Sequence, residues 1–473
     1  MSPSPARDVN SLEFRKLRKP GTLIMRQFLK SQSARIWAVA LIVLLCIAPV
    51  CHAYSVLTHE ALVDSAWDAA IKPLLLQRFP NATRDELKTA HSYAYGGAVI
   101  QDMGYYPFGS KLFSDLVHYV RSGDFIEALL RDSQDINEYA FALGALAHYA
   151  ADNDGHRMAT NKAVPILYPK LRRKYGNTVV YDENPAAHLK VEFGFDVVQV
   201  AKGRYAPDDY RDHIGFQVSK DLLSRAFEET YCLKLDNIFT DYDLALGTYR
   251  YAVGGVIPKM TKVAWQTKKD QIMQDDPSMT RKKFLYHLSR ASYKKNWDRK
   301  FRAPSFGERL IAFFIRILPK VGPLSALSFR VPTPPVEKLF MASFNQSLDD
   351  YGRYTRDYVR DPNAFDLVDD NFDTGTVTRP GEYPLADQTY AALLDRLTES
   401  KFAQVSPELR KNILAYFADP AAPLAVKKNK KEWAKVSREV DELKANAVAD
   451  NAPPANCSTQ PDASGVCPAA NNP

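Results

Sequence analysis

The chain has 473 residues, with 62 Lys and Arg against 55 Asp and Glu. Residues 1–53 hold 8 of the basic and 2 of the acidic residues, which leaves 54 basic against 53 acidic residues in the remainder. A nearly neutral remainder excludes a global basic field that attracts nucleic acid, so any anionic substrate must be gripped locally.

The first 53 residues have the pattern of an export signal. Basic residues precede an apolar run over residues 37–48, and the small residue Ala53 follows at a suitable distance for cleavage. We expect a mature chain that begins at Tyr54 and a protein that is exported to the periplasm or secreted. A leader of 53 residues is unusually long, whereas a leader that starts at Met25 has the ordinary length. An uncleaved N-terminal anchor is the less favoured alternative, because the apolar run is short for a membrane span.

Helical periodicity recurs along the rest of the chain, whereas strand signals are scarce, and the sequence therefore predicts an all-α protein. The pattern Thr83-Arg-Asp-Glu86 is a capping box that begins one of the helices. Residues 177–181 are a short extended piece, either a strand or the edge of a loop. The predicted helices cover residues 58–67, 83–104, 110–120, 135–152, 222–233 and 241–254, and one more starts at residue 186.

The composition becomes rich in Lys and Arg near residue 265, and we place a domain boundary there. The predicted organisation is a multi-helix domain over residues 54–265 and a mostly helical C-terminal region of unknown role over 266–447. A tail over 448–473, rich in Pro, Ala and Asn, is expected to be disordered. The sequence leaves open whether the second region covers, docks on or extends the first.

Three segments of the second region carry expectations of their own. Residues 306–329 are apolar but interrupted by Arg316 and Pro319, and a packed core helix is favoured there over an interfacial membrane contact. Residues 369–375 resemble a calcium loop but lack its Gly spacing and terminal Glu, so calcium is not expected. Residues 426–445 are predicted to form a charged, exposed helix.

The most informative stretch is His148-Tyr-Ala-Ala-Asp152-Asn-Asp-Gly-His156. It follows a run over residues 141–147 that is apolar nearly all round a helical wheel, which is typical of a helix buried inside a domain. An uncompensated charge there costs on the order of several kcal/mol, whereas metal coordination satisfies imidazole and carboxylate together. The alternative is a core histidine with a capping Asp, and spacing alone leaves both interpretations open.

The spacing of these three side chains predicts more than one metal. Positions i, i+4 and i+8 share a helical face but spread over about 12 Å of axis, too far for one ion. We expect His148 and Asp152 to share one centre. His156 serves another centre if the helix continues, or turns elsewhere if residues 153–155 end it.

Other residues fit the same chemistry. His188-x-x-x-Glu192 places an imidazole and a carboxylate on one helical face, a pairing used in helical zinc sites. His59 lies near the expected mature N-terminus, His118 lies in a predicted helix, and Asp102 lies near the end of another. Together with the central stretch, these residues make a metal-binding domain a moderately specific prediction.

The order of these residues resembles that of the bacterial zinc-dependent phospholipase C family, whose architecture is shared by the zinc-dependent single-strand nucleases. The resemblance covers roughly residues 54–250 and implies an all-α domain of that fold with three zinc ions. The side chains that carry it are His59, Asp102, His118, His148, Asp152, His156, His188 and Glu192.

The resemblance also implies how a close pair of zinc ions is held. Asp102, His118 and His148 hold one ion of the pair, and His59 holds its neighbour. Asp152 bridges the two ions.

The third and more distant ion is implied to bind His156, His188 and Glu192. Family members commonly carry a longer gap after the bridging Asp, so Asp154 is a substitute candidate for His156. In this family the α-amine and the first carbonyl of the mature chain chelate one zinc, which assigns that role to Tyr54, although the family usually begins with Trp.

By this resemblance the chain is predicted to be a phospholipase C that cleaves phospholipid head groups with a zinc-activated hydroxide. A membrane surface is one setting in which it would meet its phospholipid substrate. Asp102 would also orient the attacking water or act as its base. Glu192 favours this branch, whereas the short gap from Tyr54 to His59 favours the alternative, a zinc-dependent nuclease or other phosphodiesterase.

A non-catalytic exported protein stabilised by zinc is the second alternative, although carboxylate-rich ligand sets are typical of open catalytic sites. The preferred interpretation takes phospholipid as substrate, involves no nucleic acid, and leaves the oligomeric state open. Residues 105–108, Tyr-Tyr-Pro-Phe, either cage a quaternary ammonium head group or pack as ordinary core and loop residues, and packing is the favoured of the two.

Overall fold

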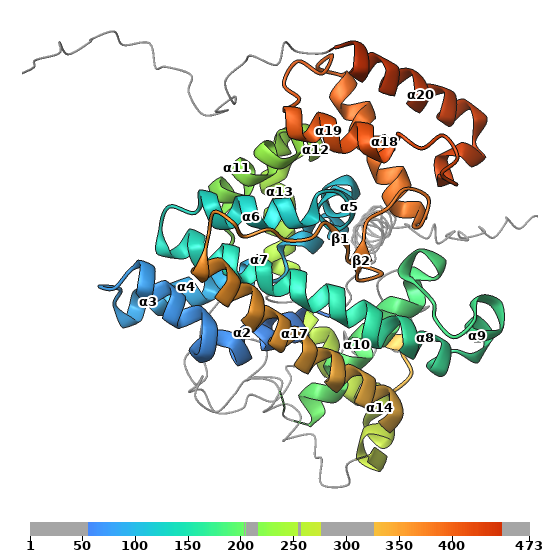
Figure 1. Cartoon of the computed structure of the whole chain (residues 1–473). Helices are drawn as coiled ribbons and strands as arrows, with labels where there is room; N and C mark the ends of the chain where they lie inside the picture. The colour runs from blue at the N-terminus through green and yellow to red at the C-terminus, as the bar shows by residue number, and fades with distance from the viewer. Residues whose placement is uncertain (1–54, 203, 205–215, 254–256, 276–325, 447–473) are drawn as a thin grey trace, which may run out of the picture. The chain divides into compact units, whose positions relative to one another are not determined.

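The computed structural model describes residues 55–202, 204, 216–253, 257–275 and 326–446, which are coloured in Figure 1. In this part of the chain the regular structure is helical apart from one small sheet, in which two short strands pair antiparallel. The all-α fold class is therefore confirmed. Outside the described residues lie the predicted leader, Tyr54, the greater part of segment 306–329 and the tail.

The first half of the described chain contains the elements on which every predicted side-chain ligand lies. Its α-helices are α2 (Val56–Ala66), α3 (Lys72–Arg78), α4 (Arg84–Gly97), α5 (Lys111–Tyr119), α6 (Ser122–Asp132), α7 (Ile136–Asp154), α8 (Asn161–Leu167), α9 (Pro169–Tyr175), α10 (Pro185–Ala201), α11 (Lys220–Tyr231), α12 (Leu235–Ile238), α13 (Tyr242–Tyr251) and α14 (Ile257–Asp275). Short 3₁₀ or π segments join them: η1 (Trp67–Ile71), η2 (Ile100–Tyr105), η3 (Gly155–Thr160) and η4 (Tyr181–Glu183).

Helix α4 begins at the predicted capping box. The Thr83 hydroxyl oxygen accepts a hydrogen bond from the Glu86 backbone N–H at 3.2 Å, and the Glu86 carboxylate accepts one from the Thr83 N–H at 2.8 Å. The predicted end at residue 104 is wrong, because α4 ends at Gly97 and a separate 3₁₀ helix, η2, follows. Two successive glycines weaken the helix there, and Val99 leaves the helical conformation with φ at −133°.

The contact between α4 and α7 depends on glycines at the crossing. A Cβ atom added at Gly97 would lie 1.9 Å from the Phe141 carbonyl oxygen, and one added at Gly144 would lie 2.0 Å from the Ala94 carbonyl oxygen. The two backbones therefore touch directly. Helix α7 also packs against α2, α6 and α17, and every residue from Tyr139 to Asp154 is buried, as its apolar sequence predicts.

Residues 177–180 form a loop edge, the second of the two outcomes left open by the sequence, and Tyr181 begins η4. The Val179 N–H donates to the Asn161 carbonyl at 2.9 Å, and residues 177–180 form no strand. The sheet forms instead within a turn-rich segment, where β1 (Asp370–Asn371) pairs with β2 (Thr376–Val377). Gly375 closes this hairpin in the left-handed conformation, with φ at +61°, which suits glycine.

The C-terminal elements share the core of the first half. One hydrophobic cluster of buried residues extends along the sequence from Val56 to Leu443, and Figure 1 shows α17 running alongside α7. The predicted boundary at residue 265 stays a prediction about chain organisation. The elements concerned are α17 (Pro334–Arg360), α18 (Pro384–Thr398), α19 (Pro407–Tyr416), η7 (Ala425–Lys428) and α20 (Lys430–Ala445).

Helix α20 has one buried face and is not exposed all round. Val436, Val440 and Leu443 are buried and belong to the shared core, and Glu439 is buried as well, while the other charged residues of the helix are exposed. The spacing of these apolar residues at i, i+4 and i+7 marks a docking stripe that the high charge of the segment obscured.

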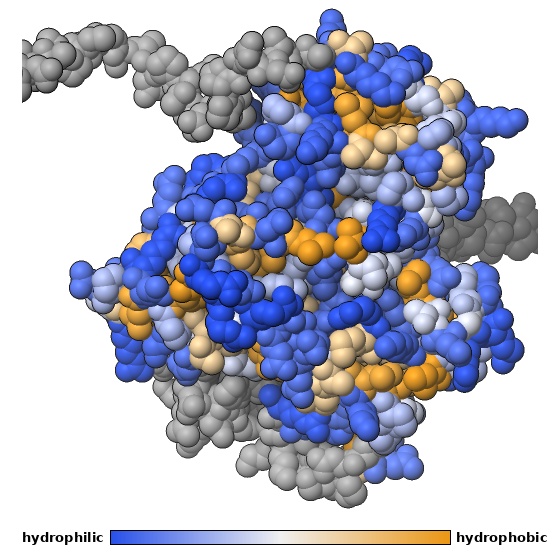
Figure 2. All heavy atoms as spheres, viewed as in Figure 1, coloured by the Kyte–Doolittle hydropathy of each residue, from blue (hydrophilic) through white to orange (hydrophobic). Residues whose placement is uncertain are grey.

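The described surface is mainly hydrophilic on the face that Figure 2 draws. On the face drawn in Figure 2, apolar residues form separate patches between larger hydrophilic areas. Within the ranges that the structure describes, no helix combines the length and the apolar character needed to cross a bilayer.

Candidate metal centre

The fold brings the predicted ligands together from six different elements, and each of these side chains is at most 3% exposed. They form two assemblies, called here the pair group and the third group. The pair group consists of His59 on α2, Asp102 on η2, His118 on α5, and His148 and Asp152 on α7. The third group consists of His156 on η3 with His188 and Glu192 on α10.

The carboxylate of Asp152 lies at the centre of the pair group. Its Oδ1 is 3.4 Å from His59 Nε2, while its Oδ2 is 3.2 Å from His148 Nε2 and 3.5 Å from His118 Nε2. The two oxygens thus face different histidines. This division is what a carboxylate shared between two neighbouring ions requires.

The N···O distances around Asp152 fit metal coordination better than direct hydrogen bonding. Two ligand atoms of one tetrahedral zinc lie roughly 3.3–3.4 Å apart, given bonds of about 2.0–2.1 Å. Direct hydrogen bonds of this kind are usually shorter, about 2.7–2.9 Å. The observed 3.2–3.5 Å therefore leaves room for an ion between the imidazoles and the carboxylate.

Backbone carbonyls fix the orientation of three imidazoles. Nδ1 of His118 contacts the Ser114 carbonyl at 2.7 Å, and Nδ1 of His148 contacts the Ala98 carbonyl at 2.9 Å. A carbonyl can only accept, so Nδ1 carries a proton and Nε2 is the nitrogen that faces the carboxylates. Outer-shell contacts of this type set the tautomer of metal-binding histidines.

A backbone carbonyl also orients a histidine of the third group, but here Nε2 donates to the carbonyl and Nδ1 faces the carboxylate. Nε2 of His188 donates to the Val179 carbonyl at 2.6 Å, and its Nδ1 lies 3.7 Å from Glu192 Oε1. Within the described chain, Nδ1 of His188 and Nδ1 of His156 are buried and make no hydrogen bond. Buried polar atoms of this kind are costly unless something satisfies them.

A π-helical segment places His156 in the third group. Helix α7 continues without a break into η3, and Gly155 keeps right-handed helical angles where a helix end was an alternative. The π turn adds a residue to the local repeat and so changes the direction in which His156 points. Asp154, the substitute candidate, forms an ion pair with Arg157 at 2.8 Å and is not a member of any metal group among the described residues.

The charges of the pair group compensate one another. Burial lowers the pKa of His118, but the carboxylates of Asp102 and Asp152 outweigh burial and raise that pKa to about 10. Burial raises the pKa of Asp152, but His148, His118 and His59 outweigh it and hold that pKa well below the usual range. Without an ion, His118 therefore holds a proton that a metal would displace.

The third group lacks such compensation. Burial, helped by the charges of Asp152 and Asp102, raises the pKa of Glu192 well above its usual range. Burial and the neighbouring His156 lower the pKa of His188 to about 3. A bound cation would stabilise this site, because it would favour the ionised carboxylate of Glu192 and accept the lone pair of the neutral imidazole.

The donor sets fit zinc. Three combinations place one ligand atom from each member within 4.8 Å of the others: His59 with His148 and Asp152, Asp102 with His118 and His148, and His156 with His188 and Glu192. Imidazole and carboxylate donors in sets of three are those of catalytic zinc sites. The number of ions and the individual ligands remain the predictions made from the sequence.

The C-terminal hairpin contributes contacts that were not predicted from the sequence. Phe372 is fully buried, and its ring centroid lies 5.1 Å from that of His118 and 6.0 Å from that of His148. Asp373, the next residue, places Oδ1 at 3.3 Å from His156 Nε2. The clustered acidic residues of segment 369–375 were the only signal available, and no spacing rule links them to histidines so far away in the chain.

The aromatic residues 105–108 do not form one cage. Tyr105 faces the pair group, with its ring centroid 6.0 Å from that of His118, whereas Tyr106 is buried against Tyr249. Phe108 is 51% exposed. These side chains point into three different environments, as the packing interpretation predicts.

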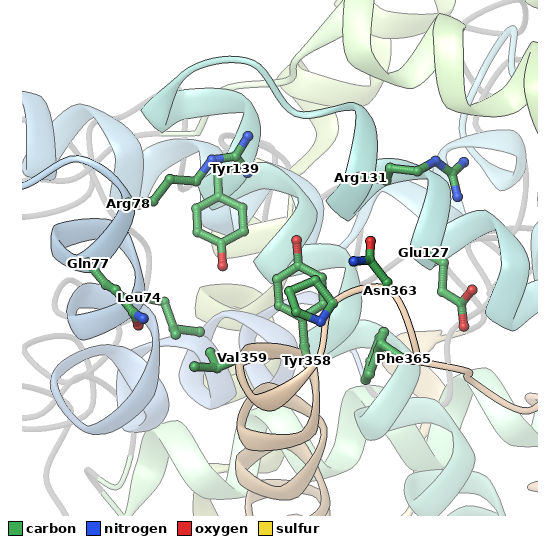
Figure 3. A pocket seen from close by; sticks show the side chains of 11 residues that line it. Leu74, Gln77, Arg78, Glu127, Arg131, Tyr139, Tyr358, Val359, Asn363 and Phe365 are labelled. Carbon is green, nitrogen blue, oxygen red and sulfur yellow. The ribbon is translucent and has the colours of Figure 1, made fainter.

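A separate cavity of about 620 Å³ lies between α3, α6, α7 and α17 (Figure 3). Tyr139 and Tyr358 face each other inside it with ring centroids 6.4 Å apart, and the Arg78 guanidinium lies 4.7 Å from the Tyr139 ring centroid. None of the predicted ligands lines this cavity or a second one of about 510 Å³. The predicted ligands therefore lie apart from both of these cavities.

Comparison with known proteins agrees with the geometry. Residues 58–240 match the family described as zinc dependent phospholipase C, and this segment contains all eight side chains of the pair group and the third group. No curated protein and no solved structure matches the chain significantly. The match confirms the resemblance that the order of the histidines and carboxylates suggested.

Proposed function

We propose that this chain, whose residues 58–240 belong to the zinc dependent phospholipase C family, is an exported phospholipase C that hydrolyses phospholipids and uses three zinc ions. The observation that carries the proposal is the division of Asp152 between His59 on one side and His118 and His148 on the other. A structural zinc site is usually closed by four protein ligands around one ion, whereas a shared carboxylate is typical of a catalytic pair.

The residues that would hold the ions are those predicted from the sequence. Asp102, His118 and His148 would hold one ion, His59 its neighbour, and Asp152 both. When bound, zinc neutralises phosphate oxygens and lowers the pKa of water, which lets a phosphodiester be attacked near neutral pH.

The third ion would be held by His156, His188 and Glu192. The Tyr54 amine and carbonyl, which lie outside the described residues, would complete one centre. The contacts with the Ser114, Ala98 and Val179 carbonyls hold these three rings in place and leave the opposite nitrogen of each ring for an ion.

The remaining chemistry belongs to the chain itself. Asp102 is fully buried and its Oδ1 lies 3.5 Å from His118 Nε2, so it is placed to orient water or to accept a proton from it. Hydrolysis joins the water oxygen to phosphorus and breaks the phosphorus–oxygen bond to diacylglycerol. Asp102 accepts a proton from the water and releases it to solvent, and the departing diacylglycerol oxygen takes up a proton from solvent.

The test compares two substrates under one set of conditions. The mature chain, purified with zinc, is assayed on phosphatidylcholine vesicles and on single-stranded DNA, each with and without a chelator. Release of phosphocholine that the chelator abolishes is the expected result. Asp152→Asn is the matched inactive control, because it keeps the side-chain shape and removes the shared charge.

The outcomes separate the three interpretations. Zinc-dependent hydrolysis of DNA but not of phosphatidylcholine would contradict the phospholipase proposal and identify the protein as a nuclease. Bound zinc with no hydrolysis of either substrate would favour a zinc-stabilised exported protein. N-terminal sequencing of the exported protein tests the leader, since any residue other than Tyr54 at its start contradicts the predicted cleavage.

A further inference from the structure

Asp373 reaches the metal centre from outside the segment that matches the family. It lies in the turn between β1 and β2, is 3% exposed, and places Oδ1 at 3.3 Å from His156 Nε2. Its other oxygen, Oδ2, accepts hydrogen bonds from the hydroxyl groups of Tyr119, at 2.7 Å, and of Tyr383. The two tyrosines thus occupy one oxygen and leave the other facing the histidine.

The backbone around Asp373 is fixed from several sides. Its N–H donates to Asn371 Oδ1 at 3.0 Å, and its carbonyl accepts from Asn161 Nδ2 at 2.8 Å. A Cβ atom added at Gly375 would lie 2.2 Å from the Asn153 carbonyl oxygen, so the hairpin turn rests directly on the end of α7. The carboxylate is held in place before any ion binds.

The N···O distance of 3.3 Å alone suits either a long hydrogen bond or two ligands of one ion. Asp373 stands outside the set formed by His156, His188 and Glu192, whose ligand atoms all lie within 4.8 Å of one another. That position favours an outer role. His156 also keeps a second nitrogen, Nδ1, which is buried and makes no hydrogen bond in the described chain.

We propose that Asp373 is a positioning residue that orients His156 for the third metal ion. The inference rests on the proposed zinc-dependent function and extends it to the C-terminal region. The Asp373 carboxylate accepts the proton of Nε2, which leaves the lone pair of Nδ1 for the ion. Carbonyls do the same for His118, His148 and His188, but a carboxylate also raises the basicity of the ring.

Asp373→Asn tests the proposal because it preserves shape and removes the charge. The affinity of the most weakly held zinc is measured by competition with a chromophoric chelator, and the stoichiometry by elemental analysis. We expect the dissociation constant of one zinc to rise by roughly 10–100-fold, the usual effect of losing an outer-shell partner. The other two ions should be retained.

Asp370→Asn is the matched control in the same hairpin. Asp370 accepts a hydrogen bond from the Tyr149 hydroxyl at 3.2 Å and belongs to neither metal group. Equal loss of zinc in both variants, with equal falls in thermal stability, would mean that the hairpin acts only through folding and would overturn the proposal. Should Asp373→Asn fail to fold, Tyr383→Phe removes one hydrogen bond to the carboxylate and should weaken the same zinc less strongly.

Two spectroscopic readouts distinguish positioning from direct ligation. Nitrogen NMR of labelled histidine in the metal-free protein should show the Nε2–H tautomer of His156, and this preference should weaken in Asp373→Asn. The visible spectrum of the cobalt-substituted variant should keep the same coordination number at the third site. A changed coordination number would make Asp373 a ligand and overturn the positioning role.

The proposed function and this inference fail in different ways. If the wild-type protein binds fewer than three zinc ions, both the three-ion proposal and the inference about Asp373 are contradicted. A wild-type protein with three ions and an Asp373→Asn variant of equal affinity overturns the inference alone.

Discussion

The imidazole rings of His59 and His148 stack face to face, with centroids 4.4 Å apart and an angle of 11° between their planes. One ring comes from α2 and the other from α7, so the packing of two helices sets their separation. Both Nε2 atoms point at the Asp152 carboxylate, at 3.4 and 3.2 Å. Parallel rings that face the two oxygens of one carboxylate suit two ions lying side by side.

Replacement of Asp152 should disable the pair group. In Asp152→Asn the shared negative charge is lost, and we expect both paired zinc ions to be released and phosphatidylcholine hydrolysis to fall more than about 100-fold, beyond the roughly 10–100-fold effect of an outer-shell change. Elemental analysis and the vesicle assay measure the two effects.

Asp154→Asn is the control for that experiment, on the same helix. Asp154 pairs with Arg157 and takes no part in a metal group among the described residues, so its zinc content should stay at the wild-type level. Loss of one zinc from Asp154→Asn would instead identify Asp154 as a ligand in place of His156.

Zinc binding should release protons in a manner set by His118. The Asp102 and Asp152 carboxylates outweigh burial and raise the pKa of His118 to about 10, so the metal-free ring is protonated at pH 7, whereas a ligand must be deprotonated. Apparent zinc affinity should therefore increase as pH rises towards 10. Calorimetry in two buffers of different ionisation enthalpy counts the protons, and His118→Gln should release fewer.

The raised pKa of His118 also predicts the direction in which the stability of the metal-free protein changes with pH. The folded-state pKa of His118 lies above the unfolded value of about 6.5, so the stabilisation is fully present below pH 6.5 and is lost as pH rises through about 10. Urea unfolding of chelator-treated protein between pH 6 and 10 measures it. A midpoint that rises over this range would contradict the assignment.

Glu127 should make the folded protein less stable at alkaline pH. Burial raises its pKa, and although the Leu367 N–H opposes this, nearby carboxylates bring the value to about 7. A raised carboxyl pKa stabilises the fold below the unfolded value of about 4.5, and this contribution disappears as pH rises through 7.

Glu127→Gln keeps an oxygen that can accept from Leu367 and removes the charge. Its unfolding free energy should exceed that of the wild type above pH 7, by no more than about 1 kcal/mol because the group is partly exposed and screened. Denaturant unfolding at pH 5 and pH 8 provides the measurement, with no gain expected at pH 5.

The glycine at the crossing of α4 and α7 should be intolerant of any side chain. Gly144→Ala would put a Cβ atom 2.0 Å from the Ala94 carbonyl oxygen, and the helices would have to separate. We expect a loss of roughly 1–3 kcal/mol in stability and weaker zinc binding, because His148 takes its orienting contact from Ala98 on the α4 side. Thermal unfolding and chelator competition test both effects.

Gly247→Ala is the control for this variant. Gly247 lies in α13, and an added Cβ atom there meets nothing within 4 Å. Replacement of a helical glycine by alanine without a clash should stabilise by about 0.4–1 kcal/mol. Equal destabilisation by both substitutions would argue against the close approach as the cause.

Local sequence was sufficient for the helix that carries the central ligands. The apolar residues around His148 predicted a buried helix, and the structure buries every residue of α7 from Tyr139 onward. The i, i+4, i+8 spacing predicted separate centres, and the structure places His156 with a different group from His148 and Asp152. Both inferences depend only on helix geometry, which is the same in every protein.

Local sequence was insufficient wherever two segments compete or meet. The close backbone approach of α4 and α7 at Gly97 was not predicted, and the π turn at Gly155 continues a helix whose sequence equally suited an end. The buried face formed by Val436, Val440 and Leu443 on α20 was not predicted, because the segment is highly charged and only its contact with the core shows which face is buried.

The sequence by itself determined the stretch from His148 to His156, the chemical types of the ligands and their resemblance to zinc-dependent phospholipase C, because residue order and helical spacing are local properties. Only the tertiary structure decided that Asp152 directs one oxygen at His59 and the other at His118 and His148. It alone brought Asp373 to His156. Contacts between distant segments depend on how whole helices pack, and no periodicity within one segment encodes the partner it will meet.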